Sequence, residues 1–286
     1  MSTFLNISYR DLSDQEKFDI ADIVAADTLE ECNANCSDVI FKETFYSKYG
    51  KRFLDIIFSF FALVISFPIN FVLAICTFID VGNPIFFGQK RIGKNCKIYQ
   101  LKKFRNMTND RDELGNLLPA SERVTKFGKF VRKNSLDELL NFWYVFTGKM
   151  SIIGPRPMPD YYLHRFNKRH IKRHLVRPGL ECPLHSTSYH GEMTWENRFE
   201  NDIWYVQNIS FKTDMMMVYL LIKDALFSPR RQNRGSAVNF TFIGYFPDGT
   251  IMHSGNIPDK YYQEIISRRN YKYEEDNNER GSTIST

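Results

Sequence analysis

The sequence has few cysteines, few strand-like segments and no large excess of one charge. Its five cysteines are an odd number, and Cys32 and Cys36 have no second Cys or His pair at a metal-site spacing. We therefore expect reduced thiols, no paired disulfide framework and no zinc site. The strand-like segments are too few and too scattered for a doubly wound sheet. No internal repeat is present.

Charge is nearly balanced, and its placement is more informative than its sum. The formal charge is +5, and the fractions of 43% hydrophobic and 25% charged residues describe a folded protein. The basic excess is concentrated in three clusters, Lys48–Arg52, Lys90–Arg105 and Arg165–Arg177. Such clusters suit anionic lipid head groups, phosphorylated ligands or nucleic acid, or are simply solvated. Because they flank apolar segments, we expect lipid and phosphate partners and no nucleic acid.

The most apolar stretch is Ile56–Ile79. Its length would allow a helix to cross a bilayer, at ~1.5 Å per residue against ~30 Å of hydrocarbon. It begins too deep in the chain for a signal peptide. Pro68 interrupts its middle, shortly after Ser66. A proline inside a helix removes a hydrogen bond and produces a kink, so each half is too short to cross alone.

Both flanks of this stretch are basic. Lysines and arginines precede and follow it at Lys48, Lys51, Arg52, Lys90, Arg91, Lys94 and Lys97. Because positive charge marks the cytoplasmic side of a membrane, we expect both ends to stay on the cytoplasmic face. The stretch would then form a re-entrant helix hairpin that dips into one leaflet. The alternative is an ordinary kinked span whose C-terminal side lies outside.

The remaining patterns predict a mixed α/β fold that is mostly helical. Short strands are expected at Ile85–Gln89 and Lys97–Phe104, and a hairpin at Asn239–Ser254 follows a linker at Pro229–Ser236. Helical patterns occupy Asp14–Ile23, Arg123–Arg132, Leu136–Phe146, Asp160–Leu175, Trp195–Gln207 and Thr213–Phe227. The predicted helix at Asp160–Leu175 carries a strongly basic face. The one at Thr213–Phe227 is either an interfacial amphipathic helix or a buried core helix. The tail after Tyr273 is expected to be disordered.

The segment 134–157, NSLDELLNFWYVFTGKMSIIGPRP, is the most informative part of the chain. The Ser135-x-x-Glu138 spacing predicts a capping box, which would place Asp137 and Glu138 in the first turn of a helix. Free backbone N–H groups and the positive end of the helix dipole gather there, so that position holds carboxylates ionised and attracts phosphate. The alternative is that both carboxylates only stabilise a helix end.

Several motifs now agree in order and spacing. They are Lys51-Arg52-x-x-Asp55 before the broken apolar stretch, NPIFFGQKRIG (83–93), KFRNM (103–107), SLDEL (135–139), MSIIGPRP (150–157), RPG (177–179) and W-x-x-R-F-x-x-D-x-x-Y-V (195–206). This set resembles the bacterial sugar transferases of the monotopic phosphoglycosyl transferase family. The resemblance covers about residues 51–227.

The resemblance implies a reaction and a place in the cell. Members of this family move a sugar-1-phosphate from a UDP-sugar to polyprenyl (undecaprenyl) phosphate, and they release UMP. They work on the cytoplasmic face of the bacterial inner membrane, initiate capsule, exopolysaccharide or O-antigen assembly, and sometimes form homodimers. The chain would then comprise an accessory segment (1–47), a re-entrant membrane helix (48–82), a small catalytic domain (83–227) and a C-terminal extension (228–286).

The resemblance also assigns roles to residues. Asp137 matches the family's nucleophile, which forms a covalent aspartyl-phosphosugar, and Glu138 matches its Mg²⁺ ligand. Arg132 matches an arginine that contacts phosphate. Further candidates for the diphosphate or lipid-phosphate site are Arg105, Arg156, Lys103 and Arg91, because guanidinium and ammonium groups suit phosphate oxygens.

The sequence departs from the family pattern in two places that bear on the site. The family places Ser directly before Pro at the membrane break, whereas here Phe67 separates Ser66 from Pro68. After the RPG motif, Leu180-Glu181-Cys182 stands where a Thr-Gly-Trp type of stretch is usual. The second departure lies in a region that we associate with sugar discrimination.

Two other functions fit parts of the sequence. Asp110-Arg111-Asp112 has the Asp-x-Asp pattern of nucleotide-sugar glycosyltransferases, which release a nucleoside diphosphate and not a monophosphate. A non-catalytic membrane scaffold for polysaccharide assembly is the other alternative.

Overall fold

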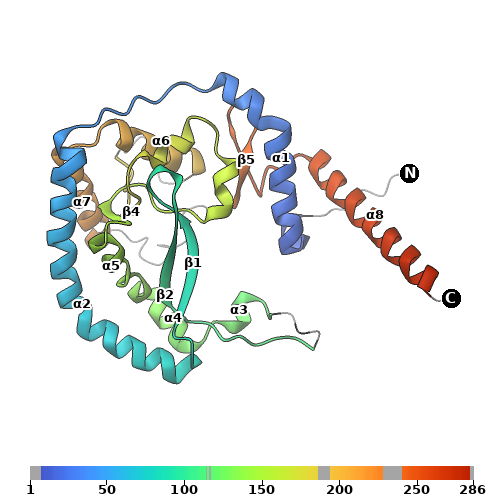
Figure 1. Cartoon of the computed structure of the whole chain (residues 1–286), viewed down its shortest axis with the longest axis horizontal. Helices are drawn as coiled ribbons and strands as arrows, with labels where there is room; N and C mark the ends of the chain where they lie inside the picture. Colours follow the sequence, from blue (N-terminus) through green and yellow to red (C-terminus); the bar gives the residue numbers. More distant parts are fainter. Residues whose placement is uncertain (1–7, 114, 116, 186–193, 228–239, 284–286) are drawn as a thin grey trace.

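The computed structural model describes residues 8–113, 115, 117–185, 194–227 and 240–283, and it has the predicted mixed α/β, mostly helical character (Figure 1). The α-helices are α1 (Asp14–Asn35), α2 (Lys51–Val81), α3 (Ala120–Arg123), α4 (Lys126–Lys133), α5 (Asn141–Phe146), α6 (Trp195–Gln207), α7 (Phe211–Phe227) and α8 (Asp259–Thr283). The strands are β1 (Phe86–Ile92), β2 (Ile98–Phe104), β3 (Ser151–Ile153), β4 (Gly179–Glu181), β5 (Phe242–Tyr245) and β6 (Ile251–His253).

The described strands form three separate pairs, and no large sheet, as the sequence indicates. The pairs β1–β2 and β5–β6 are antiparallel, and β3–β4 is parallel. The β3–β4 pair depends on glycine, since a Cβ on Gly179 would lie 2.1 Å from the backbone nitrogen of Gly154. This close approach places the Gly-Pro-Arg-Pro turn directly against β4.

The apolar stretch forms one long helix. Pro68 lies inside α2 without ending it, and the ribbon of α2 bends along its course (Figure 1). The buried residues of α2 are mostly polar: Lys51, Asp55, Ser59, Ser66 and Thr77, with Leu73 as the one apolar member. The other sides expose large apolar side chains such as Phe61, Ile65, Phe67 and Phe71. By length and composition, α2 is the one helix of the described residues that could cross a membrane.

The N-terminal end of α2 is attached to the domain that follows it. The Arg52 guanidinium donates to the carbonyls of Val145 and Phe146, at 2.6 Å each. Asp55 Oδ1 accepts hydrogen bonds from the Ser151 hydroxyl at 3.0 Å and from the Ile152 N–H at 3.1 Å. These contacts tie the start of the helix to α5 and β3.

The C-terminal end of α2 is attached to the same domain. The Arg105 guanidinium donates to the carbonyls of Val81 and Gly82 at the end of the helix. Asp80 accepts a 2.6 Å hydrogen bond from the Thr125 hydroxyl, which also caps α4. Both ends of the bent helix therefore contact one domain.

The predicted helix at Asp160–Leu175 is wrong. Two 3₁₀ segments, η5 (Asp160–Arg165) and η6 (His170–Leu175), replace it, with Asn167 accepting from the His170 N–H between them. The predicted basic face is also wrong, because Arg165 and Arg173 are only 2% and 1% exposed. Each guanidinium is drawn inward by a partner from a distant part of the chain, the Phe242 carbonyl and the Asp202 carboxylate respectively.

The two ends of the described chain pack together. Helix α1, the β5–β6 hairpin and α8, which we call the terminal clasp, lie on one side of the molecule, and α2 curves around the other (Figure 1). Their joint core includes Ile20, Val24, Ile243, Met252 and Ile265, each 2% exposed or less. The predicted linker at Pro229–Ser236 lies outside the described residues.

The prediction of a disordered tail is wrong, because α8 continues to Thr283. Tyr261 and Ile265, near its start, are buried against α1. The Arg269 guanidinium donates to Glu16 of α1 at 2.6 Å. A partner from the opposite end of the chain therefore supports a helix that composition alone does not predict.

Segment η6 is held to α6 by Glu200, and this link gives a prediction about pH. Burial raises the pKa of Glu200, but hydrogen bonds from Arg169 and His170 outweigh burial and lower it from 4.5 to about 2. The carboxylate therefore stabilises the fold above pH 4.5, and this contribution is lost as the pH falls towards 2. We expect Glu200→Gln to lower the Tm by about 1–3 °C at pH 7, because the group is partly exposed.

The measurement is a pair of thermal melts of the wild type and of Glu200→Gln, at pH 7 and at pH 3. The difference in Tm should shrink at pH 3. An equal difference at both pH values would show that the Glu200 charge is not the cause.

Candidate active site

The Asp137–Glu138 pair lies on η4 (Leu136–Glu138), a single 3₁₀ turn between α4 and α5. The predicted capping box is wrong. Ser135 has a left-handed backbone (φ 54°, ψ 27°), and its side chain caps nothing. The Glu138 side chain bonds to side chains of other elements and not to the backbone of Ser135. The pair is thus positioned by a tight turn and by tertiary contacts, and helix capping plays no part.

Asp137 is largely buried, with 9% of its surface exposed. Its Oδ2 accepts a hydrogen bond from Lys103 Nζ of β2 at 2.9 Å. Its Oδ1 has no partner among the described residues. The ammonium group on one oxygen fixes the direction of the carboxyl group, while the other oxygen stays available to an electrophile.

Glu138 lies between two cations. Its Oε1 is bonded to the Arg156 guanidinium and is 3.7 Å from Lys103 Nζ. Burial raises the pKa of Glu138, but Arg156 and Lys103 outweigh burial, so the net pKa is lowered. The carboxylate is therefore ionised at neutral pH. Its Oε2 has no partner in the described part of the chain.

These donors fit a magnesium ion that is shared with a substrate. Mg²⁺ commonly takes one or two carboxylates and completes its shell with phosphate oxygens and water. Glu138 offers the free Oε2, with Asp137 adjacent to it. Among the described residues there is no group of three or more His, Cys, Asp or Glu side chains that could hold a metal without help.

Arg156 is held firmly by the turn after β3. Its guanidinium donates to the Leu180 carbonyl at 3.0 Å and approaches Glu181 at 3.3 Å, in addition to Glu138. Burial lowers the pKa of Arg156, but the carboxylates of Glu181 and Glu138 raise it by more. The net pKa is therefore raised, and the guanidinium stays charged. Its backbone carbonyl accepts a 3.0 Å hydrogen bond from Arg173.

Four of the predicted site residues therefore meet: Asp137, Glu138, Lys103 and Arg156. Arg91 contacts the segment next to this group, because its guanidinium donates to the Pro157 carbonyl at 2.9 Å. Arg132 is exposed and donates to Asn106 at 2.7 Å, with no contact to the dyad.

The Arg105 side chain reaches the C-terminal end of α2, where its guanidinium donates to backbone carbonyls. Ser66 and Pro68 lie inside α2. Among the described residues, the Ser66 hydroxyl makes its hydrogen bonds within its own helix, to the Leu63 carbonyl (3.4 Å) and with the Asn70 amide (3.3 Å).

Sequence reasoning missed the partners of Arg156. Glu181 was noticed only as a departure after the RPG motif, and the structure places its carboxylate beside the dyad's arginine. The buried Arg173–Asp202 pair, at 2.6 Å, supports the Arg156 backbone. The presence of Asp202 in the W-x-x-R-F-x-x-D motif was the available signal, although nothing in it indicated the partner.

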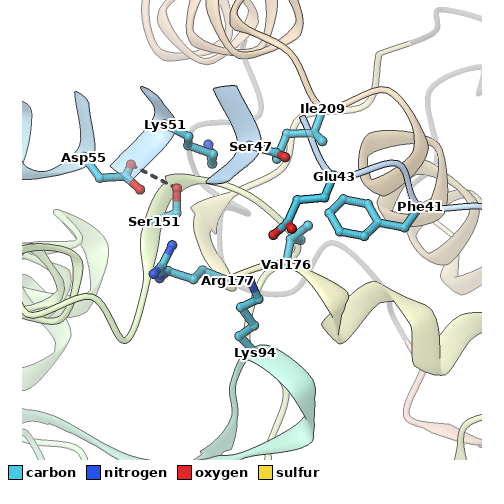
Figure 2. A pocket seen from close by; sticks show the side chains of 10 residues that line it. All are labelled: Phe41, Glu43, Ser47, Lys51, Asp55, Lys94, Ser151, Val176, Arg177 and Ile209. Atoms are coloured by element: carbon cyan, nitrogen blue, oxygen red, sulfur yellow. Dashed lines mark hydrogen bonds between the residues drawn. The ribbon is translucent and has the colours of Figure 1, made fainter. Parts of the chain in front are cut away.

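A second polar hollow lies at the start of α2, away from the dyad cluster (Figure 2). Asp55 and Lys51 reach it from α2, Ser151 from β3, and Lys94 and Arg177 from the opposite wall. None of the lining residues belongs to the cluster around Asp137. Asp110, of the Asp-x-Asp pattern, instead lies in an exposed loop and accepts from the Thr108 hydroxyl at 2.5 Å.

The cluster lies within the part of the chain that matches a known family. Residues 46–228 match the model of the family described as bacterial sugar transferase. The chain is 38% identical, over 68% of its length and 96% of the relative's, to the uncharacterized sugar transferase EpsL of Bacillus subtilis (strain 168).

Relatives with named substrates match over the same domain. The UDP-N-acetylgalactosamine-undecaprenyl-phosphate N-acetylgalactosaminephosphotransferase of Aeromonas hydrophila is 30% identical over 62% of this chain and 43% of its own length. The UDP-glucose:undecaprenyl-phosphate glucose-1-phosphate transferase of Klebsiella pneumoniae is 34% identical over 60% of this chain and 39% of its own length. This chain thus spans less than half of these two relatives. The chain belongs to the bacterial sugar transferase family of phosphoglycosyl transferase enzymes.

Proposed function

We propose that this protein transfers a sugar-1-phosphate from a UDP-sugar to polyprenyl phosphate, with undecaprenyl phosphate as the acceptor. The observation that carries the proposal is the carboxyl pair Asp137–Glu138, in which each residue has one oxygen without a partner among the described residues, with the cations Lys103 and Arg156 alongside. This arrangement offers a nucleophile and positive charge for a diphosphate. The named relatives use such donors and acceptors, which supports the assignment.

In the proposed first step, Asp137 Oδ1 attacks the phosphorus that carries the sugar. The bond from that phosphorus to the oxygen of UMP breaks, UMP leaves, and an aspartyl-phosphosugar remains. An oxygen of polyprenyl phosphate then attacks the same phosphorus and restores the free carboxylate, so that the scheme is ping-pong.

The chain's own groups lower the barrier by position and charge. Lys103 orients Asp137 and balances the negative charge that builds up when Asp137 approaches the diphosphate. The Arg156 guanidinium, which is already held in place by its hydrogen bond to β4, offers further positive charge to the phosphate oxygens. Glu138 would hold Mg²⁺ through its Oε2, and the ion would neutralise charge on the donor phosphates. Arg132, exposed at the end of α4, is available to phosphate once it releases Asn106.

We also propose that α2 enters and leaves the membrane on one side. Its exposed apolar side chains need a hydrophobic environment, and both of its ends are bonded to one domain through Arg52 and Arg105. The re-entrant element is then a single bent helix and not two helices joined by a turn. The basic flanks favour the cytoplasmic face of the inner membrane, where the product would start capsule, exopolysaccharide or O-antigen synthesis.

The test is incubation of the purified full-length protein with Mg²⁺, undecaprenyl phosphate and each of several UDP-sugars. We expect UMP release with at least one donor, and radiolabel on the protein when the lipid is omitted. Release of UDP would favour the Asp-x-Asp alternative. The absence of any nucleotide product with every donor would favour the scaffold.

A further inference from the structure

The terminal clasp lies outside the matched family domain, yet it makes specific polar contacts with it. The hydroxyl of Tyr245, in β5, is 2.9 Å from His170 Nδ1 in η6. The carbonyl of Phe242, in the same strand, accepts from Arg165 at 3.2 Å. Tyr245 and Phe242 are 1% and 0% exposed, so these contacts are internal. The hairpin therefore holds both 3₁₀ segments that precede β4.

From His170 the contacts continue into α6 and back to η6. His170 Nε2 is 2.8 Å from Glu200, which also binds Arg169 at 2.6 Å. Three residues after His170, Arg173 makes two hydrogen bonds to Asp202, at 2.6 and 3.0 Å. The position of Arg173 therefore depends on how η6 is seated between β5 and α6.

Arg173 is the member of η6 that reaches the site. Its NH2 group donates to the Arg156 carbonyl at 3.0 Å, and the Arg156 guanidinium binds Glu138. A displacement of η6 would remove this support from the Arg156 backbone. The side chain of Arg156 would then lose its fixed approach to Glu138.

The clasp also shares a hydrophobic core with the segment that follows Arg156. Phe242 and Tyr245 of the clasp pack in one cluster with Met158 of that segment and Ile92 of β1. The Ile92 N–H donates to the Met158 carbonyl at 2.9 Å. The clasp thus supports Arg156 from two directions, by hydrogen bonds through η6 and by packing on Met158.

We propose that the terminal clasp is a positioning device for the active site, and that Tyr245 acts on Arg156 through His170 and η6. Tyr245 and His170 touch neither Asp137 nor Glu138, so they are positioning residues. The part of this inference that concerns turnover rests on the proposed function. The part that concerns the coupling of β5 to η6 does not.

The test compares two single-hydroxyl deletions within the clasp. Tyr245→Phe removes the bond to His170. Tyr261→Phe is the matched control, because its hydroxyl bonds only within the clasp, to Asp27 at 2.6 Å. We expect Tyr245→Phe to lower kcat for UMP release by about five-fold with little change in KM, and Tyr261→Phe to leave kcat unchanged.

Hydrogen exchange gives a readout that needs no turnover. The N–H groups of Ile171 and Lys172 bond to the carbonyls of Asn167 and Arg169 within this segment. Their exchange should be faster in Tyr245→Phe and unchanged in Tyr261→Phe. If the wild type releases no UMP from any donor, the proposed function fails and the exchange result alone decides the coupling.

A double-mutant cycle separates positioning from a general loss of stability. His170→Gln keeps an amide donor for Glu200 and lacks the ring that meets Tyr245. Adding Tyr245→Phe to His170→Gln should lower kcat by less than the two single losses combined, because both changes break the Tyr245–His170 contact and only Tyr245→Phe also removes the contact of the hydroxyl with the Asn167 backbone. If Tyr245→Phe does not fold, His170→Gln takes its place in both assays. Wild-type kcat and wild-type exchange in Tyr245→Phe, or additive losses in the double variant, would overturn the proposal.

Discussion

Replacing Asp137 with Asn should lower kcat for UMP release by about 10³-fold or more. The change keeps the size of the side chain but converts the free Oδ1 into part of a neutral amide, which is a poor nucleophile towards phosphorus. Labelling of the protein by a radiolabelled UDP-sugar should disappear with it. The measurement is UMP release under saturating donor and undecaprenyl phosphate, with the labelled half-reaction run in parallel.

Asp110→Asn is the matched control for this prediction. Asp110 is exposed and belongs to the Asp-x-Asp pattern, so the same chemical change there should leave kcat within about two-fold of the wild type. If Asp137→Asn retained full turnover while Asp110→Asn lost it, the covalent scheme would be refuted in favour of the glycosyltransferase alternative.

The second large effect concerns stability. Asp202→Ala should destabilise the protein by about 3–5 kcal/mol, because it leaves the guanidinium of Arg173 buried without its counter-charge. Asp202 and Arg173 are 2% and 1% exposed. Burial raises the pKa of Asp202 even with Arg173 beside it, because this interior disfavours the charged form of the carboxyl group. We expect a fall in Tm of about 10 °C.

An exposed ion pair provides the comparison. Glu264 and Arg268 of α8 are 2.6 Å apart, but their side chains are 42% and 58% exposed. Glu264→Gln should therefore change the free energy of unfolding by less than about 0.5 kcal/mol. Equal losses of stability in Asp202→Ala and Glu264→Gln would show that burial of the Arg173–Asp202 pair is not what makes it important.

Local sequence patterns predicted the elements whose stability is local. Helix α6 was predicted at Trp195–Gln207 and is found there, since Thr194 caps its start through the Asn197 N–H. The strands β1 and β2 were also predicted, at Ile85–Gln89 and Lys97–Phe104, and β1 lies slightly later than expected. Boundaries of this kind shift because pairing and not composition fixes them.

The predictions that failed did so because distant partners outweighed local preference. The capping box at Ser135 gave way to the contact between Glu138 and Arg156, 18 residues apart. The helical pattern of Asp160–Leu175 gave way to a polar interior in which Arg165 and Arg173 find partners on β5 and α6. The members of these pairs are 18 or more residues apart, beyond the reach of local helix and capping patterns.

The sequence motifs named the candidate residues but not their arrangement. Lys103, Asp137, Glu138 and Arg156 come together in the structure. Arg105 bonds to the end of α2 and Arg132 to Asn106, so neither contacts the dyad. Glu181 and Arg173 could not be predicted, because their importance follows only from where β4 and η6 lie.

The proposed one-sided insertion of α2, with both ends of the helix bonded to one domain, would have a mechanical consequence for the membrane. A helix that enters and leaves through the same monolayer adds cross-sectional area to that monolayer alone. The exposed rings of Phe61, Phe67 and Phe71, on either side of Pro68, would add to this area. Insertion into one leaflet favours membranes in which that leaflet curves outward. The protein should therefore bind small vesicles more tightly than large ones of equal lipid content.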